Sequence, residues 1–254
     1  MPEGDAVVRT ARLLDRGLAG QELVATDFRV PQHATADLSG GVVIGTVTRG
    51  KHLFTRVDRG NEQWSIHTHL KMEGSWQVYR LGSRWRRPGH QARLVLTTPD
   101  EQAVGFSLGI VELLRRDREE APVAHLGPDL LGPDWDPVEA VRRLQEHPDD
   151  TIRDALLDQR NLAGIGTMWA AESCFALRVH PRTRVAAVPD LTALVTKAQE
   201  LMAASAETIR QRMWVYGRRR NPCPRCGTAV AVEQLGPPGR ERPSYFCPVC
   251  QPEP

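Results

Sequence analysis

The first hydrophobic residues of the chain recur at the spacing of one helix face, at Val7, Val8, Ala11, Leu14 and Leu18. Asp5 is suited to cap the start of such a helix, and Gly20 is suited to stop it. The pattern therefore predicts a helix that follows the amino terminus directly.

From Leu23 to about Leu114 the pattern changes to short runs rich in Val, Thr, Phe and Trp, such as 42-VVIGTVT-48 and 93-RLVLTT-98. Glycine, proline and aspartate separate these runs, as they do in chains of short strands. We expect a β-sandwich or a flattened barrel here.

Residues 121–137 are rich in proline and glycine, which indicates a linker. Helical periodicity follows it, in residues 137–147, 151–159, 166–177 and 190–211. We predict an α+β multidomain protein in which residues 1–120 form the β-sandwich with its leading helix, residues 121–216 form a helical domain, and residues 217–254 form a small terminal module.

The amino-acid composition agrees with this predicted domain organisation. The chain has 254 residues and is 41% hydrophobic, enough for two moderate domains and an appendage. No apolar run approaches the roughly 20 residues of a membrane span, and the first residues are acidic, so we expect no membrane partner, no secretory signal and a cytoplasmic location. The net charge of +2 is too small to indicate a nucleic-acid partner by itself.

The distribution of charge says more than its sum. Basic residues run without an intervening acid through Arg210, Arg212, Arg218, Arg219, Arg220 and Arg225, and a second cluster, Arg84, Arg86 and Arg87, flanks Trp85. A polyanion-binding surface and a solvated basic surface both fit such clusters.

Four of the five cysteines form two Cys-x-x-Cys pairs, Cys223 with Cys226 and Cys247 with Cys250, separated by residues 227–246. This is the spacing of two knuckles joined by a β-hairpin that hold one structural Zn²⁺. A redox pair is the alternative, and it is weaker because no βαβ pattern surrounds either motif. Cys174 stands alone in an apolar helical stretch, which indicates a buried thiol.

A glycine turn and the amino-terminal proline are both compatible with a functional role, but neither is sufficient to establish one. Gly164 and Gly166 lie between two predicted helices, where a turn and the following helix amino terminus either face an anion such as phosphate or make an ordinary helix–helix connection. Pro2 follows the initiator methionine, whose removal would expose a secondary amine next to the Glu3 carboxylate. An α-amino group has a pKa near ~8, against ~10.4 for lysine, so more of it is nucleophilic at neutral pH.

Taken in order, several motifs resemble the formamidopyrimidine-DNA glycosylase/endonuclease VIII family over nearly the whole chain. They are Pro2-Glu3-Gly4, Arg49-Gly50-Lys51, His69-Leu70-Lys71-Met72-Glu73-Gly74, Leu162-Ala163-Gly164-Ile165-Gly166 and the two cysteine knuckles. The resemblance implies a β-sandwich, a helix-two-turn-helix domain and a carboxy-terminal zinc-finger β-hairpin, with DNA bound between the lobes.

The resemblance also implies roles for individual residues. Pro2 would attack the sugar C1′ as the base departs, Glu3 would shuttle protons, and Lys51 would hold phosphate and assist ring opening. Met72 would fill the gap left by an extruded base. The expected DNA phosphate ligands are His69, Gly166, Thr167 and Arg242.

Two departures from the family pattern bear on function. Thr167 stands where the family usually has asparagine, and its hydroxyl offers one hydrogen-bond donor where an amide offers two. Gly109 and Val111 stand where the purine-directed branch has arginine and phenylalanine. The second departure favours the endonuclease VIII branch, which acts on oxidised pyrimidines.

We therefore expect a bifunctional DNA glycosylase/AP lyase of base excision repair that works through an amino-terminal proline iminium and β,δ-elimination. Two alternatives remain at this point: a damaged-DNA binding protein with impaired catalysis, and an enzyme of the purine-directed branch. The expected partner is damaged double-stranded DNA, with single-stranded or bubble DNA left open. The expected assembly is a monomer, and the expected cofactor is a single structural Zn²⁺.

Overall fold

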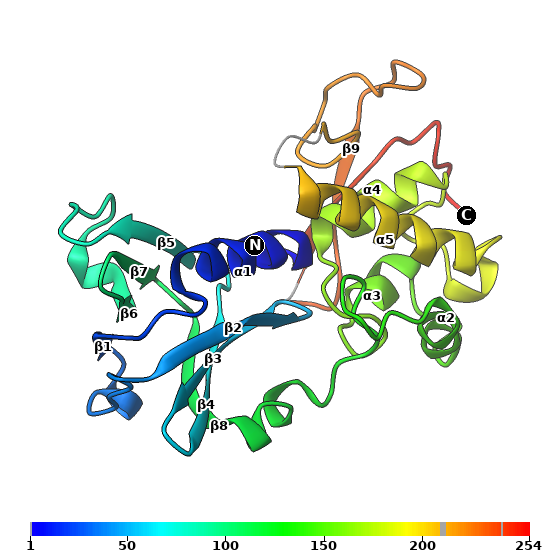
Figure 1. Ribbon diagram of the computed structural model, residues 1–254. Helices are drawn as coiled ribbons and strands as arrows, with labels where there is room; N and C mark the ends of the chain where they lie inside the picture. Colours follow the sequence, from blue (N-terminus) through cyan, green and yellow to red (C-terminus); the bar gives the residue numbers. More distant parts are fainter. Residues whose placement is uncertain (1, 209–211, 240) are drawn as a thin grey trace. The chain divides into compact units, whose positions relative to one another are not determined.

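The computed structural model describes residues 2–208, 212–239 and 241–254. These residues form two compact units, one of Ala6–Ala124 with Pro2 and the other of Glu3–Asp5 with His125–Pro254 (Figure 1). The helical segment and the cysteine hairpin thus share one compact unit. The division of the chain into three domains stays a prediction.

The first unit is the expected β-sandwich, built from two four-stranded sheets with antiparallel pairing. One sheet has the order β1-β6-β7-β5, and its strands are Ala25–Phe28, Ala92–Thr97, Glu101–Phe106 and Ser75–Arg80. The other has the order β2-β3-β4-β8, with strands Val42–Arg49, His52–Arg59, Glu62–His69 and Ile110–Arg115. Runs of alternating or buried Val, Leu and Phe explain why these segments pair as strands.

The leading helix, α1 (Gly4–Leu18), packs one face into the core of the sandwich. Val7, Ala11, Leu14 and Leu18 are all buried there, and Gly20 follows the helix with a φ of 76°, as a helix stop requires. The helix begins at Gly4, one residue before the expected cap at Asp5. Asp15 ties it to the sheet, because its carboxylate accepts a hydrogen bond from the Thr46 N–H at 2.6 Å.

The second unit contains the predicted helices, α2 (Pro137–Gln145), α3 (Ile152–Leu157), α4 (Thr167–Ala176) and α5 (Leu191–Glu207). Side chains of Asp136, Thr151 and Asp190 cap α2, α3 and α5 by accepting N–H groups of the first turn. Apolar residues of all four helices form one core around Trp169 and Met202. No helix in the described part of the chain is long and apolar enough to cross a membrane.

The terminal hairpin of β9 (Ala231–Leu235) and β10 (Arg242–Phe246) is antiparallel and is anchored on α4. Buried Glu172 of α4 accepts the N–H groups of Trp214, Val215 and Tyr216 at 2.8–2.9 Å. At the other end of the module, Gln251 accepts from the Cys247 N–H and donates to the Val179 carbonyl. The small cysteine segment therefore shares buried polar contacts with the helices.

Candidate active site

The carboxylate of Glu3 lies at the amino terminus of α4. Its oxygens accept the N–H groups of Gly166 at 2.8 Å, Met168 at 2.8 Å and Trp169 at 3.2 Å, and the residue is only 4% exposed. These N–H groups lack partners within the helix, and the helix dipole favours a negative charge at this end. The anion that the glycine turn faces in this structure is therefore the Glu3 side chain.

Two glycines of the turn before α4 make this contact possible. A Cβ atom on Gly166 would lie 2.5 Å from the Glu3 carboxyl carbon, so any larger residue would displace the carboxylate. Gly164 has a φ of 97° and its carbonyl accepts the Gly4 N–H at 2.9 Å. The turn and the Glu3–Gly4 segment thus pack backbone against backbone.

Two amide side chains shape the turn between α3 and α4. Gln159 accepts from the Gly164 N–H at 3.0 Å and donates to the Ile165 carbonyl at 2.9 Å. Asn161 donates to the Ala155 carbonyl at 2.9 Å. These contacts satisfy buried backbone groups that a short connection cannot pair within itself.

Asp5 adds a second anchor that the sequence did not reveal. Its carboxylate accepts the Trp169 indole N–H at 3.1 Å and the Ser205 hydroxyl at 2.7 Å, and the residue is 1% exposed. Glu3 and Asp5 therefore fix the residues that follow Pro2 to α4 and α5. Pro2 itself is half-buried.

The expected phosphate ligands of this unit lie on α4 and β10. Thr167 is the first residue of α4, and it lines a small pocket together with Arg153, Ser244 and Tyr245. Arg242 is exposed at the start of β10, and its main-chain carbonyl accepts from the Arg153 guanidinium at 3.2 Å.

In the sandwich, Lys51 and His69 lie at facing ends of neighbouring strands. Lys51 precedes β3, both residues are 7% exposed, and His52 pairs with His69 in the β3–β4 register. The Lys71 N–H donates to Nδ1 of His69 at 2.9 Å, which leaves the proton on Nε2. Burial, assisted by the charges of Lys71 and Lys51, lowers the pKa of His69 to about 4, so the ring is neutral at pH 7. Its Nε2–H can donate to an anion.

A chain of side chains runs behind His69 and was not visible in the sequence. His52 Nδ1 and His67 Nε2 are 2.8 Å apart, and His67 Nδ1 lies 2.8 Å from a Glu112 carboxylate oxygen. The His52 and His69 rings meet edge to face with centroids 4.8 Å apart. Burial lowers the pKa of His67 despite the opposing effect of Glu112. The Glu112 contact fixes the His67 tautomer and so orients the His52 ring that packs on His69.

Met72 is 70% exposed on the loop after β4, as an apolar wedge would have to be. By contrast, Val111 is buried in β8 and is not available at the surface.

The two clusters of basic residues are only partly exposed to solvent. Arg225 donates to the carbonyls of Phe175 and Ala176 at the end of α4, and Arg87 is bound within its own unit, whereas Arg210 lies outside the described residues.

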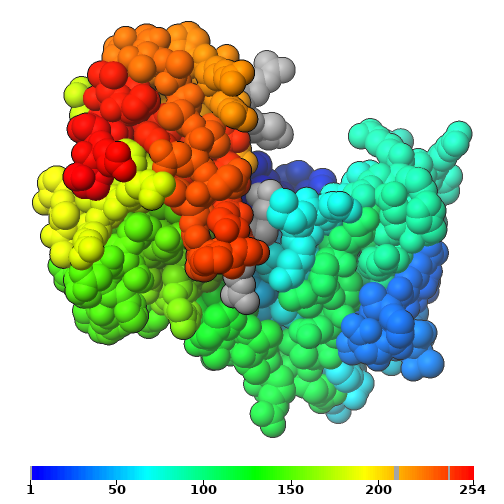
Figure 2. Space-filling view, turned by 180° about the vertical axis from the view of Figure 1, so that it is seen from behind, coloured from blue at the N-terminus to red at the C-terminus, as the bar shows by residue number. Residues whose placement is uncertain are grey.

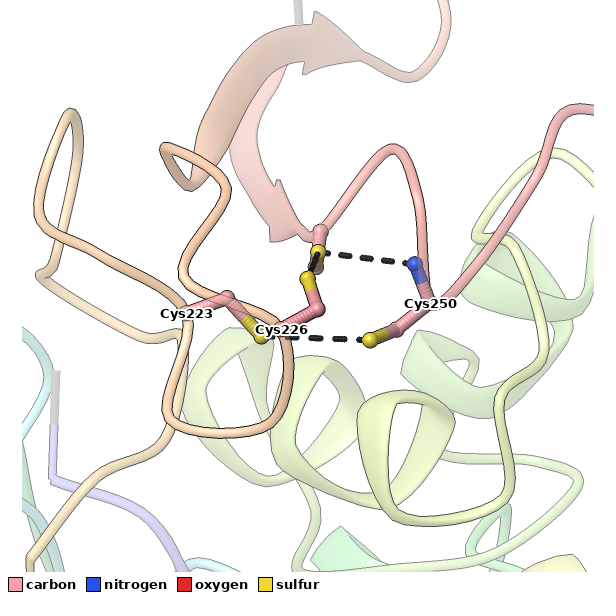
Figure 3. A group of neighbouring side chains, drawn as sticks. Cys223, Cys226 and Cys250 are labelled. Atoms are coloured by element: carbon pink, nitrogen blue, oxygen red, sulfur yellow. Dashed lines mark hydrogen bonds between the residues drawn. The ribbon is translucent and has the colours of Figure 1, made fainter.

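The four knuckle cysteines converge as their spacing predicts (Figure 3). Their sulfur atoms all lie within 4.8 Å of one another, with Cys223–Cys250 at 3.9 Å and Cys226–Cys247 at 3.5 Å. A tetrahedron with metal–sulfur bonds of about 2.3 Å has sulfur–sulfur edges of about 3.8 Å. The group therefore fits one tetrahedral metal ion with no position left for water. Cys174 is buried apart from it, and burial raises the pKa of that thiol to about 12.

The depressed pKa of His69 makes a testable contribution to stability. Because the folded pKa of about 4 lies below the ordinary 6.5, the contribution is present above pH 6.5 and is lost as the pH falls toward 4. In His69→Asn the acceptor for the Lys71 N–H is kept and the titration is removed. The unfolding free energy of wild type should fall between pH 6.5 and pH 4. We expect that fall, measured by urea titration, to be about 1–3 kcal/mol smaller in the variant. Exposed His90→Asn is the matched control, and identical pH profiles for His69→Asn and wild type would contradict the assignment.

Comparison with known proteins places these features in a family. The formamidopyrimidine-DNA glycosylase N-terminal domain matches residues 1–107, and the formamidopyrimidine-DNA glycosylase H2TH domain matches residues 126–213. "Probable endonuclease 8 2" of Streptomyces coelicolor is 48% identical over 99% of this chain and 94% of its own length. "DNA-(apurinic or apyrimidinic site) lyase Nei2" of Mycolicibacterium smegmatis is 44% identical over 99% of both chains.

A solved structure confirms the fold. Formamidopyrimidine-DNA glycosylase of Lactococcus lactis, bound non-covalently to DNA with an AP site, aligns with a TM-score of 0.85 at 21% identity, covering 99% of this chain and 100% of that one. Both family domains, in the expected order, and full-length relatives at 44–48% identity agree with the motifs and the fold. The chain belongs to the formamidopyrimidine-DNA glycosylase/endonuclease VIII family, and relatives that are 44–48% identical to it are named endonuclease 8 or DNA-(apurinic or apyrimidinic site) lyase.

Proposed function

We propose that the protein is a bifunctional DNA glycosylase and AP lyase of base excision repair, with oxidised pyrimidines as its preferred substrates. The observation that carries the proposal is the Glu3 carboxylate, buried on the N–H groups of Gly166, Met168 and Trp169 and covalently next to Pro2. A carboxylate fixed this firmly beside the second residue is suited to handling protons next to a terminal amine. One full-length relative is named a DNA-(apurinic or apyrimidinic site) lyase, and another, at 28% identity, is named a formamidopyrimidine-DNA glycosylase, which supports both activities.

The proposed chemistry begins once Met1 has been removed and the Pro2 nitrogen is a free secondary amine. The nitrogen attacks C1′ of the damaged nucleotide, the N–C1′ bond forms, and the glycosidic bond breaks as the base leaves. Opening of the sugar ring gives an iminium at C1′, which acts as an electron sink. Loss of a C2′ proton then allows the 3′ phosphate to leave, and a second elimination releases the 5′ phosphate. Glu3 accepts and returns protons in these steps.

The DNA backbone would be held from both units. In the sandwich, Lys51 supplies a charge and His69 supplies a neutral Nε2–H donor. In the helical unit, Thr167 offers its hydroxyl where α4 begins, and Arg242 is exposed on β10, where its guanidinium suits bidentate phosphate contact. Gly166, also an expected ligand, donates its N–H to Glu3 in this structure, so its role would be to leave room at the start of α4.

Base extrusion would rely on Met72. Its exposed thioether side chain can enter the stack and offset the stacking lost when a nucleotide turns out of the duplex. Gly109 and buried Val111 supply no second large wedge at their positions. This difference supports the pyrimidine-directed branch over the purine-directed one.

We propose that the ion in the cysteine cluster is one structural Zn²⁺, held by Cys223, Cys226, Cys247 and Cys250. Four thiolates in tetrahedral spacing match zinc and leave no site for catalysis. Bound zinc would stabilise the segment that carries Arg242. The remaining elements of the proposal are a monomer acting on damaged double-stranded DNA, with bubble or single-stranded DNA as a further substrate, in the cytoplasm with the chromosome.

The activity is tested on a duplex with a single thymine glycol. We expect base release and strand cleavage that leaves phosphate on both sides of a one-nucleotide gap. Glu3→Gln should lower the single-turnover rate about 100-fold or more, as loss of a general acid–base group does. Its affinity for a duplex with an uncleavable abasic analogue should fall far less.

Exposed Glu22→Gln is the control for loss of one carboxylate and should keep the wild-type rate. Tight binding without cleavage by the wild-type protein would favour a damage-binding protein. Faster release of oxidised guanine than of thymine glycol would favour the purine-directed branch.

The metal assignment predicts one zinc per chain by elemental mass spectrometry. Cys226→Ser and Cys250→Ser should each lower zinc content and weaken DNA binding about tenfold or more, because structural zinc supplies folding energy to its segment. Cys174→Ala removes a buried thiol outside the cluster and should keep full zinc. Wild-type protein that retains DNA binding after complete removal of zinc would contradict a structural role.

A further inference from the structure

Arg87 lies in the loop between β5 and β6, which projects from the sandwich (Figures 1 and 2). Unlike its exposed neighbours Arg84 and Arg86, it is half-buried. Its guanidinium donates to Gln91 Oε1 at 2.9 Å, to the Ser75 hydroxyl at 2.9 Å, to the Glu73 carbonyl at 3.2 Å and to the Ser107 hydroxyl at 3.1 Å. Its carbon Cζ lies 5.5 Å from the centre of the buried Phe106 ring. One side chain thus joins three separate loops.

The first of these loops carries Met72. It is closed tightly by a hydrogen bond from the Gly74 N–H to the Leu70 carbonyl at 2.9 Å, and a Cβ atom on Gly74 would lie 2.3 Å from that carbonyl oxygen. Lys71 has a φ of 52°, a left-handed conformation that is uncommon for a residue with a side chain. Met72 follows at the exposed tip. Such a conformation persists only where surrounding contacts hold it.

The connection between β7 and β8 packs against this loop. The Gly109 N–H donates to the His69 carbonyl at 2.9 Å, and a Cβ atom on Gly109 would lie 2.1 Å from Cγ of Lys71. Ser107, which Arg87 binds, also has a positive φ, of 48°. The residue that replaces the arginine of the purine-directed branch therefore makes room for the stem of the Met72 loop.

We propose that Arg87 is a positioning residue that holds the Met72 loop ready to enter the DNA stack. Its planar fork links the Glu73 carbonyl, next to Met72, to the Ser107 hydroxyl, so it ties the loop that contains left-handed Lys71 to the connection that contains left-handed Ser107. A wedge that is already ordered loses little conformational freedom on insertion, so more of its contact energy serves base extrusion. The inference rests on the proposed role of Met72 as the wedge.

The test is a double-mutant cycle on single-turnover release of thymine glycol from a duplex, with 2-aminopurine opposite the lesion to report extrusion. Arg87→Met and Met72→Ala should each slow extrusion and base release about tenfold, and the double variant should be no slower than Met72→Ala within about twofold, because residues acting through one element are not additive. Arg87→Lys keeps the charge without the fork and should remain slow. Exposed Arg93→Met loses one charge from the same sheet and should match wild type within about twofold.

The outcomes separate this inference from the proposed function. Multiplying effects of Arg87→Met and Met72→Ala, or full activity of Arg87→Met, would overturn the positioning role while leaving the glycosylase assignment intact. A wild-type extrusion rate for Met72→Ala would overturn the wedge and this inference together. In that case, strand cleavage by the same preparation at a preformed abasic site would show that the proposed AP lyase activity is present. Thermal melts confirm that each variant is folded.

Discussion

The contact between the Glu3 carboxylate and the start of α4 organises much of the structure. It requires a helix amino terminus with unpaired N–H groups, a glycine at position 166 that leaves room for a carboxyl group, and a chain end that can reach both. The Asp5 contacts with Trp169 and Ser205 secure the same segment a second time. Because the chain continues directly into α1, these contacts also determine where that helix begins.

The same helix organises the other end of its unit. Glu172 receives the N–H groups of the segment that leads to the cysteine module, and Arg225 from that module donates to the last carbonyls of α4. The amino terminus of α4 therefore binds the acidic side chain of Glu3, and its carboxyl terminus binds the basic side chain of Arg225, as the helix dipole favours. Through these contacts the cysteine knuckles and the β10 arginine are built on the helix that holds Glu3.

Local patterns were enough to predict the helices, the β-sandwich region and the cysteine hairpin. Periodicity located α1 through residues such as Leu14 and Leu18, and the spacing of Cys223, Cys226, Cys247 and Cys250 was enough to predict their cluster. The family motifs pointed to Glu3 and Gly166 separately, and their direct contact across 163 residues of chain became visible only in the fold.

Other features had no local signal. The His52–His67–Glu112 chain depends on the register of three strands, and the contacts of Arg87 depend on three loops meeting around one guanidinium. A basic cluster in the sequence does not distinguish Arg87, which is bound within the sandwich, from exposed Arg86. Long-range pairing of this kind is decided by topology and packing, which composition and periodicity do not encode.

The role of Pro2 as nucleophile is tested most simply by borohydride trapping on a duplex with an abasic site, followed by peptide mass mapping of the attached residue. The terminal-proline mechanism predicts a covalent adduct on Pro2 in protein that has lost Met1, and loss of that adduct in Pro2→Ala. An adduct mapped to a lysine, or no adduct from protein that cleaves the same duplex, would contradict the terminal-proline mechanism.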